Sequence, residues 1–206
     1  MSRFLLAVSV IALTGCHFLG THDAAKTAFD FGMPETHASR HVPETLPANL
    51  IVANIVAPGW MDNSSMYYRL TYRNAANPLP YANSQWVMSP AALLTQRLRW
   101  TLGAGDEGAS KSGGSTREAY LLRGELIEFE QIFDQPDKSR GVLRLRATLE
   151  GQRDGRRTQR TFEIERPAPT PDAAGGVKAL SLCADELSDS VTEWVANNLN
   201  TKLNEP

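Results

Sequence analysis

The feature that most constrains the fold is a strand pattern in the second half of the chain. In segment 142–150 the side chains at positions 143, 145, 147 and 149 are apolar, whereas those at 144, 146, 148 and 150 are polar. Such alternation is typical of an antiparallel strand with one buried and one solvated face. Asp154-Gly155 follows and is a strong hairpin signal. The sequence therefore predicts a hairpin between 142–150 and a returning strand at 158–166.

If Asp154 and Gly155 are the central turn residues, they set the register of this hairpin. On the outer face the register pairs Arg144 with Glu165, Arg146 with Glu163, and Thr148 with Thr161. On the inner face it pairs Leu145 with Ile164 and Ala147 with Phe162. Opposite charges outside and apolar pairs inside thus follow from one register.

The remaining pattern predicts more strands and two helices. Strands are expected at 50–57, 66–72 and 120–133, and the segment 74–83 between the last two is typical of a turn-rich connection. Ser89-Pro90 favours a helix start and Gly103 a helix end, and a second amphipathic helix is expected after Pro171-Asp172. The order predicts an α+β fold: a mainly antiparallel sheet with two amphipathic helices packed on one face.

The run from Leu5 to Cys16 is the most apolar stretch of the chain. It holds about a dozen residues, too few for a membrane-spanning helix, which needs about 20. A basic start, an apolar run and small residues at its end are typical of a secretory signal. The tetrad Leu13-Thr14-Gly15-Cys16 resembles the lipobox of bacterial lipoproteins. We expect 1–15 to be a signal peptide and Cys16 to be acylated, for example with palmitate; the alternative is a buried first strand.

The segment 16–48 is predicted to be a lipid-anchored tether, because it has few large apolar side chains and several prolines. A short strand is expected near 28–32, where apolar and polar residues alternate. A single α+β domain is expected over 49–200, interrupted by a flexible Gly/Ser-rich loop at 103–116.

All four histidines, His17, His22, His37 and His41, fall in the tether. The spacing of His37 and His41 would suit a metal site on a helix, but the nearby Pro34 and Pro43 leave little room for one. A third ligand is also missing from the pattern. No metal site is predicted.

The composition excludes several kinds of chemistry. A net charge of −2 does not suggest a nucleic-acid partner. The domain from residue 49 onward has no histidine, which excludes a Ser-His-Asp triad or a Cys-His pair within it. No cofactor fingerprint occurs, and Cys183 lies between Leu180 and Leu187 on the apolar stripe of the closing helix, which favours a buried thiol. The protein is predicted to bind rather than to catalyse.

One enzymatic alternative stays open. Glu128 and Glu130 lie on the same face of the strand expected at 120–133, so a carboxylate-based periplasmic hydrolase is conceivable. The competing interpretation is a solvated strand face, because any two residues at this spacing lie about 7 Å apart.

Several segments in order resemble the ABC-type transport auxiliary lipoproteins, the PqiC-like family. The segments are Tyr68-Arg69-Leu70, Tyr81 to Trp86, Ser89 to Leu94, Phe129 to Asp134 with Ser139 to Leu143, and the closing Ala-rich helix. They cover most of residues 29–198. The Gly/Ser-rich loop and the histidine-bearing tether are not features of the family's core.

The resemblance implies a location and partners. Such a protein is anchored in the outer membrane by the lipid on Cys16, faces the periplasm, and works with an inner-membrane ABC transporter. An MCE-type protein of that system forms a periplasmic conduit for lipids or other hydrophobic molecules. For sorting, His17 stands where an aspartate would favour inner-membrane retention. A structural or assembly lipoprotein without a transporter is the rival interpretation.

The residues expected to dock on a partner, or to support a homo-oligomer, are Tyr68, Arg69, Tyr81 and Trp86. Aromatic residues and arginine are enriched at binding hot spots. An equally open interpretation is that Tyr68 and Trp86 cap the core between a strand and a helix.

Overall fold

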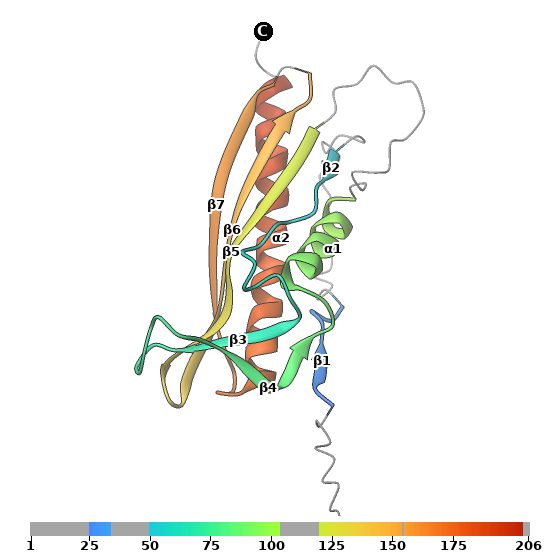
Figure 1. Ribbon diagram of the computed structural model, residues 1–206. Helices are drawn as coiled ribbons and strands as arrows, with labels where there is room; N and C mark the ends of the chain where they lie inside the picture. The colour runs from blue at the N-terminus through green and yellow to red at the C-terminus, as the bar shows by residue number, and fades with distance from the viewer. Residues whose placement is uncertain (1–24, 34–49, 104–119, 154, 204–206) are drawn as a thin grey trace, which may run out of the picture.

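The computed structural model describes residues 25–33, 50–103, 120–153 and 155–203 (Figure 1). The predicted signal peptide, Cys16, the four histidines and nearly all of the loop at 103–116 lie outside these residues. The elements are β1 (Thr27–Phe29), β2 (Leu50–Val52), β3 (Ser65–Leu70), β4 (Pro78–Trp86), α1 (Pro90–Leu102), β5 (Tyr120–Gln135), β6 (Lys138–Gly151), β7 (Arg157–Pro167) and α2 (Ala173–Leu203).

The strands form one seven-stranded sheet in the order β1-β4-β3-β5-β6-β7, and β2 pairs with β5. The long strand β5 organises the sheet, because β2 pairs with its first residues and β3 with its last part. The next two strands, β6 and β7, continue the sheet on the other side of β5. In Figure 1, α2 runs alongside these three long strands.

The sheet is mixed, so the prediction of a mainly antiparallel sheet is wrong. The pairs β3–β4, β5–β6 and β6–β7 are antiparallel, whereas β1–β4, β2–β5 and β3–β5 are parallel. The α+β class and both predicted helices are confirmed. Alternation within one strand reports which faces are buried, but it does not report the direction of the neighbouring strand.

The hairpin predicted from the alternating strand is confirmed, but its register is wrong by two residues. Arg144 pairs with Glu163 and Leu145 with Phe162. The Gly151 amide donates to the Arg156 carbonyl oxygen at 3.0 Å, so four residues rather than two separate this bonded pair in the connection. Gly155 closes this loop with φ +63°, a conformation that glycine favours. A shift of two preserves the faces, which is why the inner and outer sets were predicted correctly.

The segment 74–83, expected to be a connection, contains most of β4. Pro78 and Pro80 favour a turn in a sequence, yet both lie in a strand that pairs with β3. Only the end of this strand, Ser84 to Trp86, pairs with β1. Among the described residues, β4 thus has a neighbour on one side only where the prolines lie, the position in a sheet where proline is tolerated.

Helix α1 begins and ends where the sequence predicts. The Ser89 hydroxyl caps its first turn by accepting a hydrogen bond from the Ala92 amide, and Gly103 ends it with φ +59°. The Arg97 guanidinium donates to Asp185 on α2 at 2.6 Å and also to the carbonyl oxygens of Phe31 and Gly32. This arginine therefore connects α1, α2 and the segment after β1.

Helix α2 has 31 residues and is capped by Asp172, whose carboxylate accepts a hydrogen bond from the Gly175 amide at 2.8 Å. It approaches β6 closely: a Cβ at Gly141 would lie 2.9 Å from the Leu180 backbone nitrogen, so only glycine fits there. Further along, Trp194 meets Phe162 of β7 edge to face at 5.9 Å. Within the described part of the chain, no helix is long and apolar enough to cross a membrane.

Candidate functional site

The four residues predicted to form a docking surface lie on the adjacent strands β3 and β4. Tyr68 and Arg69 are neighbours in β3, so their side chains point to opposite faces of the sheet. Tyr81 and Trp86 lie in β4. The structure therefore separates Arg69 from the tyrosines instead of gathering the four side chains on one surface.

The two tyrosines form a polar and aromatic cluster on the face that α2 covers. The rings of Tyr68 and Tyr81 lie 4.6 Å apart, and the Tyr81 hydroxyl donates to Gln131 Oε1 at 2.9 Å. The Gln131 amide in turn donates to Ser139 Oγ at 2.8 Å. Burial raises the pKa of Tyr81, so its hydroxyl stays protonated and remains a donor at neutral pH. This cluster joins β3, β4, β5 and β6 below the start of α2.

On the opposite face, Arg69 forms an ion pair with Glu130 of β5. Its Nη2 and Nε atoms lie 2.7 and 3.0 Å from Glu130 Oε1, and its Nη1 atom donates to the Ala75 carbonyl oxygen at 2.7 Å. The Glu130 side chain is 2% exposed and the Arg69 side chain 19%. Arg69 thus links the β3–β4 turn, through Ala75, to Glu130 on the central strand β5.

Burial raises the pKa of Glu130 above its usual value, and the neighbouring Arg69 opposes that shift only in part. Its second oxygen, Oε2, is buried and has no hydrogen-bond partner. The carboxylate therefore depends on a single arginine for its charge balance.

The second acidic residue of the predicted pair, Glu128, is also held by an arginine. Its Oε2 lies 3.3 Å from Arg144 Nη1, and Glu130 is held by Arg69. In this geometry each carboxylate is paired with a guanidinium. Among the described residues, no three His, Cys, Asp or Glu side chains are grouped so that they could hold a metal ion.

Trp86 belongs to the core and is 1% exposed, so its side chain offers no surface for docking. Its ring meets Phe31 and Phe129 edge to face at 5.6 and 5.5 Å. The alternative interpretation, in which this tryptophan caps the core between β4 and α1, describes its position.

An exposed tryptophan that the sequence did not single out, Trp60, packs on β3. Tyr67 and Arg69 are two positions apart in β3 and so share a face, and Trp60 packs edge to face on Tyr67 at 5.2 Å. Trp60 is 43% exposed, and its carbonyl oxygen accepts a hydrogen bond from the Tyr67 hydroxyl at 3.0 Å. We call Trp60, Tyr67 and Arg69 the β3 surface. A tryptophan just after the turn signal Pro58-Gly59 was the clue available in the sequence.

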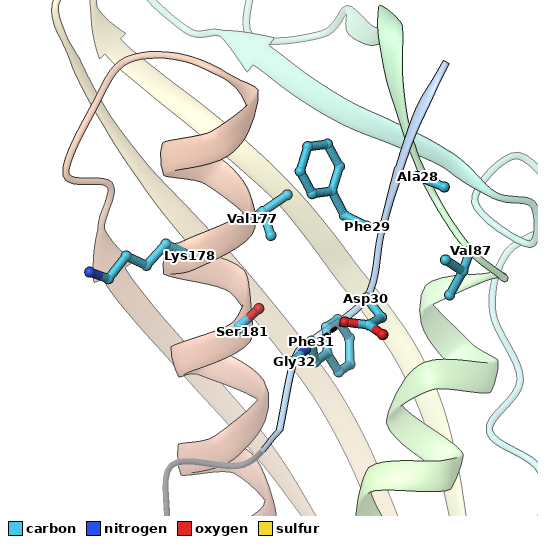
Figure 2. Close-up of a pocket in the computed structure, with 9 residues that line it drawn as sticks. All are labelled: Ala28, Phe29, Asp30, Phe31, Gly32, Val87, Val177, Lys178 and Ser181. Atoms are coloured by element: carbon cyan, nitrogen blue, oxygen red, sulfur yellow. Dashed lines mark hydrogen bonds between the residues drawn. The ribbon is translucent and has the colours of Figure 1, made fainter. Parts of the chain in front are cut away.

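A second feature is a shallow hollow of about 400 Å³ between β1 and α2 (Figure 2). It is lined by Ala28, Phe29, Asp30, Phe31, Gly32, Val87, Val177, Lys178 and Ser181. Figure 2 shows Val177 and Ser181 turned towards the 28–32 segment, whereas the Lys178 amino group points away. The hollow therefore presents mainly apolar side chains at the place where the N-terminal segment enters the domain.

Cys183 is buried, as the sequence predicts. Its sulfur lies 3.6 Å from the Gly141 carbonyl oxygen, in the close contact between α2 and β6. Burial raises the pKa of the Cys183 thiol to about 12.

We expect Cys183 to react slowly with a thiol reagent in the native protein, because it is inaccessible and almost wholly protonated at neutral pH. Labelling should become fast in denaturant, and a chromogenic disulfide reagent followed with and without urea measures both rates. Equal rates in the two conditions would contradict the buried position.

A family model described as the ABC-type transport auxiliary lipoprotein component matches residues 31–204. The chain belongs to this family. The match includes β2–β7 and both helices, and so all the contacts described above except those of β1. No curated protein matches the chain.

Solved structures show the same fold. Protein XCC0632 from Xanthomonas campestris is 17% identical, with a TM-score of 0.66 over 86% of this chain and 98% of that chain. A second, uncharacterized protein is 18% identical, with a TM-score of 0.59 over 83% of this chain and 99% of that chain. At these identities the likeness concerns the fold alone.

Proposed function

We propose that the mature protein is a lipoprotein of the outer membrane that faces the periplasm and serves an ABC transporter by binding, not by catalysis. The observation that carries this proposal is the family match over residues 31–204, together with the lipobox ending at Cys16. The partner is an MCE-type periplasmic protein, and the cargo is lipid or another hydrophobic molecule. Acyl chains on Cys16 provide the anchor, because several chains at one site hold a protein durably.

The contact with the partner uses the β3 surface. Trp60 is partly exposed and held in place by Tyr67, so it offers a large apolar area at little cost in side-chain entropy. Arg69 lies on the same face, and its position is fixed by Glu130 and Ala75. Aromatic residues together with an arginine on one face are the composition typical of binding hot spots.

The structure changes how this surface should be tested. Charge reversal at Arg69 would place two carboxylates together in a buried position and would unfold the domain, so it cannot isolate a docking contact. Trp60 is the better target, because truncating a partly exposed side chain removes little of the core.

We expect Trp60→Ala to reduce periplasmic crosslinking to the transporter's MCE-type component at least about tenfold, the effect of losing a contact of about 1.4 kcal/mol. Trp100→Ala is the matched control, because Trp100 is 58% exposed but lies on α1. Circular dichroism should show both variants folded. Loss of the whole protein should also sensitise the outer membrane to detergents, and the Trp100 variant should restore resistance better than the Trp60 variant.

Two results would overturn the proposal in different ways. If crosslinking of the wild-type protein recovers no transporter component, a structural or assembly lipoprotein becomes the better description. If both tryptophan variants crosslink like wild type, the transporter role stands but the contact lies elsewhere than on the β3 surface.

A further inference from the structure

Strand β7 forms the outer edge of the sheet and is paired on one side only among the described residues. It has 11 residues, and its register with β6 runs from Arg157 to Pro167 without a shift. Edge strands are usually shortened, bulged, covered or lined with charged side chains, because their free backbone groups attract other strands. Strand β7 is neither short nor bulged and carries charged residues of both signs. A long and regular edge such as this one is suited to pairing with another strand.

Two hydrogen bonds show which backbone groups of β7 face outward. The Gly151 amide donates to the Arg156 carbonyl oxygen, and the Ala168 amide donates to the Ser139 carbonyl oxygen. Both fit the same register, so the even-numbered residues of β7 bond to β6. The amides and carbonyls of residues 157, 159, 161, 163 and 165 consequently point to the open edge.

The side chains of these odd-numbered residues lie on the face opposite to Phe162 and Ile164, which are buried. They are Arg157, Gln159, Thr161, Glu163 and Glu165. Along the strand, a basic end is followed by two neutral residues and then by an acidic end. Glu163 and Glu165 already lie 2.6 and 2.9 Å from Arg144 and Arg140 of the same sheet, but their side chains stay 53% and 46% exposed. The exposed order of charges is complementary to a second copy of the strand running in the opposite direction, whose Arg157 would join these ion pairs.

We propose that two copies of the protein join through antiparallel pairing of β7 with β7, with Thr161 facing Thr161 on the two-fold axis. Arg157 then faces Glu165 of the second copy, and Gln159 faces Glu163. On the other face, Arg160 faces Phe162 of the second copy. The proposal stands apart from the transport function, because it rests only on the sheet edge.

The charges select this register over its neighbours. Moving the axis to position 160 places Arg160 against Arg160, which is a like-charge contact. Moving it to position 162 places Arg157 against Pro167 and loses both pairs of Arg157 with Glu165. The odd-numbered residues must face one another in every such arrangement, because only they have backbone groups free for the second strand.

A cysteine at the axis tests the pairing directly. Opposed residues in a hydrogen-bonded antiparallel pair lie about 5.5 Å apart between Cα atoms, within the range that a disulfide bridges. We expect full-length Thr161→Cys to form a reducible covalent dimer under mild oxidation in the membrane. Thr158→Cys is the control, because the two copies of that residue would lie about 20 Å apart along the strand. The wild-type protein, treated in the same way, measures any covalent dimer that forms through Cys16 or Cys183 instead.

A proline at the same position tests the backbone bonds. Thr161→Pro removes an amide that faces the open edge and leaves the β6–β7 hydrogen bonds in place, so the fold should be kept. We expect its dissociation constant, measured by light scattering after detergent extraction, to rise at least about tenfold, the equivalent of about 1.4 kcal/mol.

Several results would overturn the proposal, and three of them concern the copies of this protein alone. These are a monomeric wild type, equal crosslinking of the Thr161 and Thr158 variants, or a folded Thr161→Pro protein whose oligomer is unchanged. Crosslinking of Thr161→Cys to a different protein instead of to itself would assign the edge to another partner and would also overturn it.

Discussion

Replacement of Arg69 by alanine is expected to destabilise the domain by about 3–5 kcal/mol at neutral pH, the cost typical of removing one partner of a buried ion pair. Glu130 would keep a charge in a side chain that is 2% exposed, and neither of its oxygens would have the guanidinium partner. The β3–β4 turn would also lose the hydrogen bond from Arg69 to the Ala75 carbonyl oxygen. Urea unfolding followed by circular dichroism measures the loss.

The loss of stability in Arg69→Ala should depend on pH, and the raised pKa of Glu130 determines whether the loss grows or shrinks as pH rises. Burial raises the pKa of this carboxyl above its usual value of 4.5, so the folded state holds the proton more tightly than the unfolded state does. Stability is therefore lost as pH rises from 4.5 through the folded pKa, and the charge exerts its full cost above that pKa. Without Arg69 the pKa rises further, so Arg69→Ala should be less damaging at pH 5 than at pH 7.5.

An exposed ion pair in the same sheet provides the control. Arg146 Nη1 lies 2.9 Å from Glu125 Oε2, with side chains 42% and 53% exposed. Arg146→Ala should cost no more than about 1 kcal/mol. Adding Glu130→Gln to Arg69→Ala should recover part of the lost stability, because it removes the unpaired charge. Equal losses for the Arg69 and Arg146 variants would contradict the buried-pair account.

The β6–β7 hairpin shows which structural features can be predicted from the local sequence pattern. Alternation of apolar and polar residues correctly predicted both strands and the face of each side chain in β6 and β7. It did not predict the register, because that depends on how many residues form the loop. The Asp154-Gly155 signal indicated a two-residue turn, whereas Gly155 is the last residue of a longer loop.

The parallel strand pairs could not be predicted from the local sequence pattern. The pairs β2–β5 and β3–β5 join residues far apart in the chain, such as Leu50 with Tyr120 and Tyr68 with Gln131. No hairpin signal marks such a pairing, because parallel neighbours need a long connection. The opposite faces of Tyr68 and Arg69, by contrast, follow from the alternation of neighbouring side chains in a strand, so the sequence pattern could have separated these two residues.

Only some features of the candidate site could be predicted from the sequence, because the others depend on contacts between residues far apart in the chain. Arg69 could be chosen from its residue type, but its partner Glu130 lies 61 positions away and is brought close only by the β3–β5 pairing. Trp86 was chosen because tryptophan is common at interfaces, yet the same large apolar side chain is equally suited to a core. Only the burial observed in the structure separates Trp86 from Trp60.

Cys16→Ala is expected to abolish attachment to the outer membrane. The tetrad Leu13-Thr14-Gly15-Cys16 is the predicted acylation signal, and the sulfur of Cys16 is the atom that would carry the chain. Among the described residues, no helix is long and apolar enough to span a bilayer. Because each buried methylene contributes about 0.8 kcal/mol to membrane binding, losing the acyl chains removes most of the affinity.

The chain provides a matched control for this experiment, because it contains two cysteines. Labelled palmitate should be incorporated into wild type and into Cys183→Ala, but not into Cys16→Ala, and membrane fractionation should follow the label. The Cys183 variant should fold, since its thiol occupies a small buried space that alanine also fits. With the proposed anchor, detergent resistance should be lost in Cys16→Ala even if the domain is exported, because the exported domain would lack its attachment to the membrane. Undiminished labelling of Cys16→Ala would show that the lipid is attached elsewhere, and the proposed anchor would then be wrong.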